Sequence, residues 1–200
     1  MIQFKEDLTD IFFDLDHTLW DFEKNSMLTF EKIFKEKALS IDLKQFISYY
    51  NPINQACWKK YRENRISQEE LRYKRLADTF NQIKFKTTNN QINLISEAYN
   101  TYLSSFSHLF DGTITLLEKL KSKYNLHIIT NGFEQVQHFK IKNAGLESYF
   151  DFIFTAEQVG FKKPHPQIFI HALNQTKANP KKSLMIGDSL EADILGALAQ

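Results

Sequence analysis

The sequence has little cysteine, little net charge and no long apolar run, and each shortage excludes a class of protein. Cys57 is the only cysteine, so no internal disulfide can form. The 25 lysines and arginines nearly balance 24 acidic residues, and the net charge of +1 favours neither a nucleic acid polymer nor a membrane surface. No apolar segment approaches the roughly 20 residues that span a bilayer. We therefore expect a soluble, cytoplasmic protein.

The two ends of the chain carry weaker signals. The segment Met1–Glu6 contains an acidic residue and no apolar h-region, so we expect no signal peptide. The chain stops at Gln200 inside an expected helix, where a further strand would be natural. We therefore expect either that the edge strand is absent or that the sequence is cut short.

Short apolar runs alternate with segments of helical periodicity. The expected strands cover residues 10–15, 126–130, 151–155 and 183–186. The expected helices include Leu116–Leu120, a segment ending near Ala144 with Gly145 as its C′ residue, Pro166–Asn174, and a segment from Leu190 onward. Alternating apolar strands and helices predict an α/β domain with a Rossmann-like parallel sheet.

Residues 21–106 interrupt that alternation with a block of about four helices. Apolar residues recur at helical spacing in Met27–Phe34 and Ile92–Tyr102. Asn51-Pro52 predicts a helix start, with proline at the first helical position. Ser67–Glu70 has the spacing of a capping box. We therefore expect an α/β core formed by residues 1–20 and 107–200, with a helical domain inserted at 21–106.

The chemically suggestive polar residues all follow expected strands. Asp14 and Asp16 end the first strand, Thr130 and Asn131 the second, Lys162 and Lys163 follow the third, and Asp188 with Asp193 the fourth. The carboxyl ends of parallel strands line one ligand crevice, so we expect these side chains to gather there.

Asp14 and Asp16 are two residues apart, which places both side chains on one face of an extended segment. Neighbouring carboxylates repel, so the pKa of one should be raised unless a cation lies between them. Asp188 can complete an all-oxygen site of the kind that suits Mg²⁺. A single aspartate after a strand is more often a turn or cap residue, but the whole ordered set indicates a site.

These residues resemble the motifs of one enzyme family. Asp14-Leu15-Asp16-His17-Thr18 resembles the DxDxT signature of haloacid dehalogenase-like (HAD) phosphatases. The other three motifs of that superfamily are similar to Thr130-Asn131-Gly132, Lys163-Pro164, and Gly187-Asp188-Ser189 with Asp193. The helical block lies where the superfamily inserts a C1 cap. Trp58–Arg75 looks most like the pyrimidine nucleotide 5′-phosphatase (5′-nucleotidase) subgroup.

The resemblance implies a role for each matched residue. Asp14 would attack phosphorus and become an aspartyl phosphate, and Asp16 would act as general acid and then as general base. Thr130, Asn131 and Gly132 would hold phosphate oxygens, and Lys163 would neutralise charge. The resemblance also implies Mg²⁺ bound by Asp14, the Asp16 backbone carbonyl and Asp188, with Asp193 in contact through water or orienting the ligands.

The predicted cap carries a basic segment. Seven basic residues lie between Trp58 and Arg75, namely Lys59, Lys60, Arg62, Arg65, Arg72, Lys74 and Arg75. We expect most of them on solvated helix faces. One or two, with Trp58 or Tyr61, could face a nucleobase.

Several alternatives stay open or are disfavoured. A haloacid dehalogenase lacks the second aspartate of DxD, a phosphonatase needs a cap lysine that no residue here identifies, and a receiver domain places its phosphorylated aspartate after the third strand. A sugar-phosphate phosphatase or phosphomutase of the same fold is not excluded. The expected partner is a small phosphate ester, and the sequence is compatible with a monomer or a homodimer.

Overall fold

The computed structural model describes residues 7–200 and forms two compact units. One unit contains the chain up to Phe22 together with Ser107–Gln200, and the other is Glu23–Phe106. We call them the α/β unit and the helical unit. The signal-peptide prediction concerns Met1–Glu6, which lies outside the described residues. That the helical unit acts as a cap stays a prediction.

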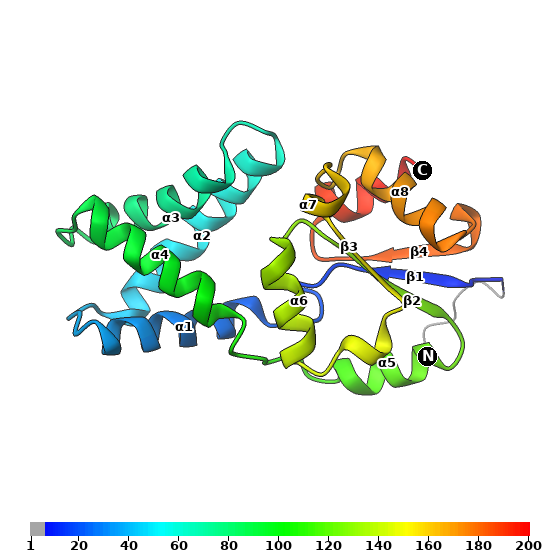
Figure 1. Cartoon of the computed structure of the whole chain (residues 1–200), viewed down its shortest axis with the longest axis horizontal. Helices are drawn as coiled ribbons and strands as arrows, with labels where there is room; N and C mark the ends of the chain where they lie inside the picture. The colour runs from blue at the N-terminus through cyan, green and yellow to red at the C-terminus, as the bar shows by residue number, and fades with distance from the viewer. Residues whose placement is uncertain (1–6) are drawn as a thin grey trace. The chain divides into compact units, whose positions relative to one another are not determined.

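The α/β unit is built on a parallel sheet, as expected (Figure 1). Its strands are β1 (Asp10–Phe13), β2 (Asn125–Thr130), β3 (Phe152–Thr155) and β4 (Ser183–Ile186), in the order β3-β2-β1-β4. The chain therefore continues from β1 to β2 and β3 on one side and adds β4 on the other. That change of direction is a topological switch point, where ligands bind outside the carboxyl ends of the strands.

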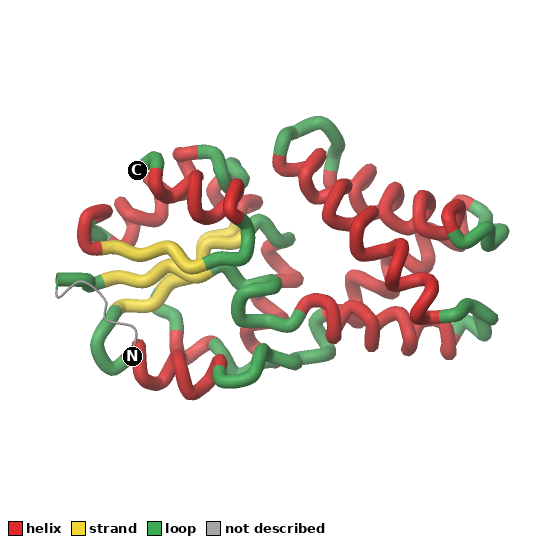
Figure 2. Tube along the Cα trace, turned by 180° about the vertical axis from the view of Figure 1, so that it is seen from behind, coloured by secondary structure: helices red, strands yellow, loops and turns green. Residues whose placement is uncertain are grey.

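Helices cover both faces of this sheet, with α5 (Thr113–Lys121) and α8 (Pro166–Thr176) on opposite sides (Figures 1 and 2). The unit also contains α6 (Glu134–Asn143), α7 (Ala156–Val159), α9 (Gly196–Leu198), the 3₁₀ turns η1 (Glu147–Tyr149) and η2 (Pro180–Lys182), and a π-helical segment η3 (Leu190–Leu195). Gly145 follows α6 with a φ of 68°, the left-handed C′ conformation expected from the sequence.

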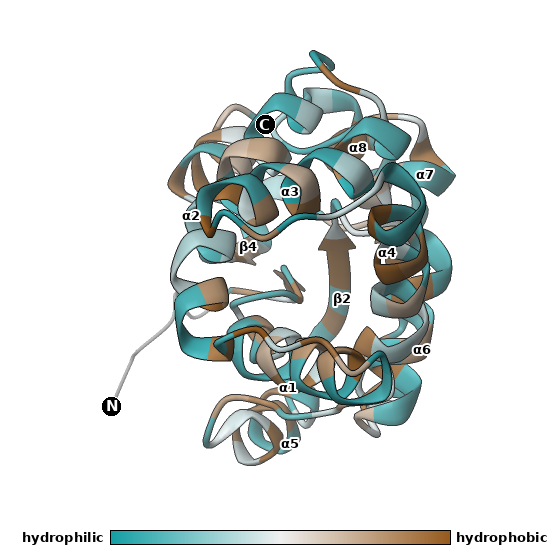
Figure 3. Cartoon of the chain, turned by 90° about the vertical axis from the view of Figure 1, so that its left-hand side faces the viewer, coloured by the Kyte–Doolittle hydropathy of each residue, from teal (hydrophilic) through white to brown (hydrophobic). Residues whose placement is uncertain are grey.

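The central strands β1 and β2 are mostly apolar and buried, as in a parallel sheet that is covered on both faces. All four residues of β1 are buried, and Figure 3 shows β2 largely in the hydrophobic colour. Phe12 and Ile129 pack with Phe154, Ile168 and Phe169 into one core cluster. This packing fixes the strand ends that carry the polar residues.

The helical unit consists of α1 (Phe22–Glu36), α2 (Leu43–Arg62), α3 (Gln68–Gln82) and α4 (Asn89–Leu103), in agreement with the expected four helices. Its core is aromatic: the ring of Phe30 lies 4.7 Å from each of the rings of Phe46, Tyr50 and Tyr99. Ser67 and Glu70 form the predicted capping box. No helix within residues 7–200 is both long and apolar enough to cross a lipid bilayer.

The predicted helix start at Asn51-Pro52 is wrong, because Pro52 lies inside the continuous helix α2. An internal proline costs about 3 kcal/mol through its missing N–H and a clash with the preceding turn. A single buried stripe extends across it, formed by Phe46, Tyr50, Asn54, Cys57 and Tyr61. Burial of each large apolar side chain contributes roughly 1.5–3 kcal/mol, so the stripe outweighs the proline.

Candidate active site

Asp14 lies where β1 ends, at the switch point of the sheet. Its N–H donates to the carbonyl of Ile186 at 2.8 Å, which extends the pairing of β1 with β4 by one residue. Its side chain is buried, and Lys163 Nζ donates to Asp14 Oδ1 at 2.7 Å. The second carboxylate oxygen accepts a long hydrogen bond of 3.4 Å from the hydroxyl of Thr18. The predicted nucleophile and the predicted lysine are thus in direct contact.

Lys163 is almost fully buried and surrounded by acceptors. Besides Asp14, its ammonium lies 2.6 Å from Asp193 Oδ1 and donates to the carbonyl of Ile129 at 2.6 Å. A lysine ammonium has three hydrogens, and these three acceptors match that number. These three contacts belong to Lys163 and not to the adjacent Lys162.

The side chain of Asn131 binds the backbone of Lys163. Its Oδ1 accepts the N–H of Lys163 at 2.7 Å, and its Nδ2 donates to the carbonyl of Lys163 at 2.9 Å. The side-chain amide thereby joins the end of β2 to the loop between α7 and α8. A role for the backbone of Asn131 and Gly132 in holding phosphate stays a prediction.

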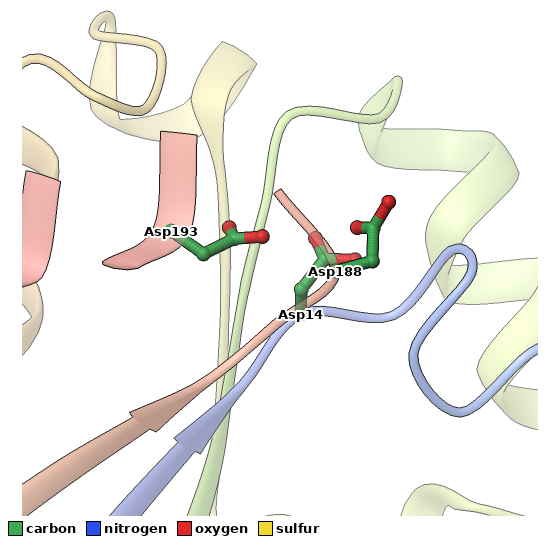
Figure 4. A group of neighbouring side chains, drawn as sticks. All are labelled: Asp14, Asp188 and Asp193. Atoms are coloured by element: carbon green, nitrogen blue, oxygen red, sulfur yellow. The ribbon is translucent and has the colours of Figure 1, made fainter. Parts of the chain in front are cut away.

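Three carboxylates converge at the switch point, as Figure 4 shows for Asp14, Asp188 and Asp193. One oxygen of each lies within 4.8 Å of the others. Asp14 leaves the end of β1, Asp188 follows β4, and Asp193 reaches toward them from η3 (Figure 4). Gly187 permits this approach, because a Cβ there would lie 2.3 Å from Asp193 Oδ2.

This arrangement has the chemistry of a site for a hard divalent cation. The three carboxylates outnumber the Lys163 ammonium, which contacts two of them, so negative charge is in excess, and all the candidate ligand atoms are oxygens. Mg²⁺ prefers such ligands and keeps several waters when few protein groups bind it. Asp14 and Asp188 fit direct ligands, whereas both oxygens of Asp193 have close partners, Oδ1 with Lys163 at 2.6 Å and Oδ2 with the N–H of Ser189 at 3.0 Å.

The pKa shifts in the cluster also fit a site for a cation. Burial raises the pKa of Asp14 to about 7, with Lys163 opposing the rise and Asp193 and Asp16 adding to it. We expected a raised pKa from carboxylate repulsion, but burial is the larger cause. Burial alone would lower the pKa of Lys163, yet Asp14 and Asp193 hold it above its ordinary value. Asp188 is exposed, in contrast to Asp14, and partial loss of hydration is the main cause of its raised pKa.

The carboxylate of Asp16 has different partners from that of Asp14. The strand ends at Phe13, and the chain turns at His17, whose φ is 63°. Asp16 Oδ1 pairs with Lys140 Nζ at 2.6 Å, and Oδ2 accepts from Gln137 Nε2 at 2.9 Å. Its carboxylate is not a member of the three-carboxylate cluster.

Thr130 is buried at the end of β2 and retains one hydrogen-bond donor. Its Oγ1 accepts from the N–H of Gly132 at 3.1 Å and from Gln137 Nε2 at 2.6 Å. Both hydroxyl lone pairs are therefore used, and the hydroxyl hydrogen can donate to a phosphoryl oxygen.

The sequence motifs do not include Gln137 and Lys140, two residues of α6 that contact Asp16. The helical spacing of the sequence contains a pattern that could have identified these two residues. Phe133, Gln137, Lys140 and Ile141 share one stripe, and the structure buries all four. A lysine and a glutamine on an otherwise apolar stripe indicate that buried polar partners exist.

In the helical unit one basic residue of the segment Trp58–Arg75 differs from the expected solvated position. Arg75 is 2% exposed, so it does not lie on a solvated face. Its guanidinium donates to Asn54 Oδ1 at 3.3 Å and lies 4.7 Å from the ring of Tyr99. Trp58 packs edge-on against Tyr61 with ring centroids 5.6 Å apart. These contacts give Arg75 a structural role inside the helical unit.

Comparison with known proteins defines the class. The chain matches the haloacid dehalogenase-like hydrolase family over residues 11–200 and belongs to that family. It is therefore an enzyme of the HAD-like phosphatase type, as its motifs predict.

The most informative relatives are nucleotidases. The chain is 34% identical to pyrimidine 5′-nucleotidase PynA of Streptococcus pneumoniae, over 93% of this chain and 78% of that protein. It is 30% identical to pyrimidine 5′-nucleotidase YjjG of Escherichia coli, over 94% of this chain and 80% of that protein. The crystal structure of the HAD-hydrolase YfnB of Bacillus subtilis bound to magnesium is similar, with a TM-score of 0.88 and 26% identity, and covers 97% of this chain and 86% of that one.

Proposed function

We propose that this protein is a magnesium-dependent phosphomonoester hydrolase that acts through an aspartyl phosphate on Asp14. The observation that carries the proposal is the buried contact of Asp14 with Lys163, beside two further carboxylates at the switch point of the sheet. A carboxylate held against one ammonium is fixed in place as a nucleophile. The excess negative charge around it provides a place for a divalent cation.

The first chemical step transfers the phosphoryl group to the enzyme. A carboxylate oxygen of Asp14 attacks phosphorus, the bond from phosphorus to the ester oxygen breaks, and Asp16 gives its proton to the leaving alcohol. Lys163 reduces the repulsion between the carboxylate and the phosphate, and Thr130 donates to a phosphoryl oxygen. The product of this step is the mixed anhydride of Asp14.

The second step returns the enzyme to its starting state. Water attacks the phosphorus of the aspartyl phosphate, Asp16 accepts a proton from that water, and Asp14 leaves as a carboxylate. Inorganic phosphate is released. Asp16 regains in this step the proton that it gave up in the first, so protons balance over the cycle.

Asp14, Asp188 and the backbone carbonyl of Asp16 would hold the magnesium ion, with Asp193 acting through water or by orienting the other ligands. The ion would contribute Lewis-acid neutralisation of phosphoryl charge. The raised pKa values of Asp14 and Asp188 support this assignment, because a bound cation replaces the proton that burial otherwise favours.

We propose nucleoside 5′-monophosphates as the substrate class. The support is the similarity to the two pyrimidine 5′-nucleotidases, together with a chain that aligns with most of their length. A sugar-phosphate phosphatase or a phosphomutase of the same fold is the alternative from the sequence. A cytoplasmic location, and a monomeric or homodimeric state, stay predictions.

The test is a phosphate-release screen of nucleotides and sugar phosphates, with p-nitrophenyl phosphate as a general substrate. We expect hydrolysis that needs Mg²⁺, stops with EDTA, requires no bisphosphate activator and is fastest with a nucleoside 5′-monophosphate. Asp14→Asn should abolish it, whereas Asp111→Asn, at an exposed aspartate of the same unit, should not. Hydrolysis that survives in Asp14→Asn contradicts the mechanism, and a preference for sugar phosphates contradicts the substrate class alone.

A further inference from the structure

Helix α6 carries two polar side chains on its buried face. Gln137 is fully buried and Lys140 is 3% exposed, on the same stripe as the apolar residues Phe133 and Ile141. Placing a lysine at a buried position is costly unless its charge is paired. The contacts of Lys140 and Gln137 show which groups offset this unfavourable free energy.

Both side chains bind the same carboxylate. Lys140 Nζ lies 2.6 Å from Asp16 Oδ1, and Gln137 Nε2 donates to Asp16 Oδ2 at 2.9 Å. An ionised carboxylate only accepts hydrogen bonds, which fixes the nitrogen of the Gln137 amide on the side of Asp16. One helix thus holds each oxygen of Asp16 with its own donor.

Gln137 also joins Asp16 to the predicted phosphate-binding threonine. The second hydrogen of its Nε2 is donated to Thr130 Oγ1 at 2.6 Å. This bridge requires a residue without a side chain at position 132, because a Cβ on Gly132 would lie 2.1 Å from Gln137 Nε2. The glycine of the second motif is therefore explained by Gln137.

Lys140 is held from a second side by an aromatic ring. Its ammonium lies 4.3 Å from the ring centroid of Trp20, which is fully buried. The face of an indole attracts a cation, and the attraction is greater where water is excluded. Ring and carboxylate together restrict the position of the lysine, which in turn restricts Asp16.

We propose that Gln137 and Lys140 are positioning residues that hold the Asp16 carboxylate for proton transfer. The inference rests on the proposed function, in which Asp16 is the acid and base. Each carboxylate oxygen has two lone pairs, so both oxygens retain one after binding α6. A group displaced by about 1 Å from its reacting position can lose about 100-fold in rate.

The proposal predicts losses that depend on the leaving group. Phosphorylation of Asp14 by phenyl phosphate or an alkyl phosphate needs a proton from Asp16, because the departing oxyanion is strongly basic. p-Nitrophenolate is a stable anion and needs little protonation. A poorly placed Asp16 therefore slows phosphorylation by phenyl phosphate more than by p-nitrophenyl phosphate, whereas general loosening of the fold slows both equally.

The experiment compares Lys140→Met and Gln137→Leu with two matched controls on the same helix, Lys142→Met and Gln135→Leu, whose side chains are exposed. The readout is kcat/KM, which reports the phosphorylation step, for both aryl phosphates. We expect Lys140→Met to lose at least about 10-fold more with phenyl phosphate than with p-nitrophenyl phosphate. Gln137→Leu should show a smaller loss of the same kind. Lys140→Arg should restore most of the difference, and the controls should match the wild type.

Equal losses for the two esters, or none, would overturn the proposal. A crystal structure of Lys140→Met provides a test that does not depend on turnover: the Asp16 side chain should occupy a different rotamer or more than one. An unmoved Asp16 in that structure refutes the positioning role even if the wild type hydrolyses both esters. A wild type inactive toward every phosphate ester refutes the proposed function instead, while a displaced Asp16 would still support the contact.

Discussion

The two units of this protein bury polar groups in different ways. The α/β unit gathers charged side chains at the ends of its strands, where Asp14, Asp193 and Lys163 lie within one buried cluster. The helical unit buries mainly hydroxyls and amides, and several of these hydrogen-bond within the unit. Thr29 donates to the carbonyl of Asn25 at 2.7 Å, and the hydroxyls of Ser26 and Tyr99 lie 2.8 Å apart.

The difference suggests that the α/β unit carries the catalytic groups, whereas the packing of the helical unit contributes mainly to stability. A buried excess of carboxylates destabilises the folded state until a cation neutralises the charge. Such an excess is expected at functional sites, where the charge takes part in binding or catalysis. The aromatic cluster around Phe30 has no such excess. The predictions below test whether substitutions in the two units separate catalysis from stability.

The largest expected effect is on activity, from Lys163→Met in the α/β unit. The variant leaves Asp14 and Asp193 without their cation, and we expect kcat to fall on the order of 1,000-fold or more. Arg75→Met in the helical unit is the matched substitution of a buried cation. It should lower stability by about 1–2 kcal/mol through the loss of its bond to Asn54, with kcat for p-nitrophenyl phosphate within about twofold of wild type. Comparable losses of kcat in the two variants would break the distinction.

A smaller effect, on stability, is expected from Phe30→Ala in the helical unit. Phe30 is fully buried and contacts four other rings, so its truncation should cost about 3–5 kcal/mol. Urea unfolding followed by circular dichroism measures the loss. Leu94→Ala, at a residue 45% exposed on the same unit, should cost less than about 0.5 kcal/mol. Equal costs would mean that the aromatic cluster does not dominate the stability of this unit.

The smallest effect is a pH-dependent shift in melting temperature from Asp14→Asn. Burial raises the Asp14 pKa from 3.8 to about 7, so the folded state holds a proton that the unfolded state has released within that window. Wild-type stability without metal should therefore fall as the pH rises from about 4 to 7, and the asparagine variant should lack this contribution. In EDTA, Asp14→Asn should melt above the wild type at pH 7.5, with the gap shrinking toward pH 5.

Magnesium sharpens that measurement, because a bound cation removes the cost of ionising Asp14. Adding Mg²⁺ at pH 7.5 should stabilise the wild type and raise the melting temperature of Asp14→Asn much less. If the difference in melting temperature between wild type and Asp14→Asn in EDTA is the same at pH 5 and pH 7.5, the pKa of Asp14 is not raised.

The sequence predicted the α/β unit well because its signals are local. Four short apolar runs are the four strands, and the motif residues Asp14 and Asp188 follow β1 and β4 closely, while Lys163 comes after β3 and the short helix α7. Each signal depends on a few adjacent residues whose burial the parallel sheet determines. The family resemblance added an expected role for each of these residues.

The failures concern features that tertiary packing decides. The local rule for proline placed a helix start at Pro52, but the buried stripe of α2 outweighs it. Arg75 looks like any other basic residue of its segment, and only the packed helices show that it is buried. Gln137 and Lys140 lie beyond the motif that ends at Gly132, and their contacts with Asp16 join positions more than 100 residues apart.

The central claim is that Asp14 becomes covalently phosphorylated, and chemical trapping tests it most directly. In Asp16→Ala the phosphoenzyme should accumulate with p-nitrophenyl phosphate, because the leaving group needs no acid while hydrolysis of the anhydride lacks its base. Borohydride reduction of the quenched enzyme, followed by peptide mass spectrometry, should then find homoserine at position 14. Release of p-nitrophenolate without any modified residue at position 14, or with the modification on another residue, would contradict the account.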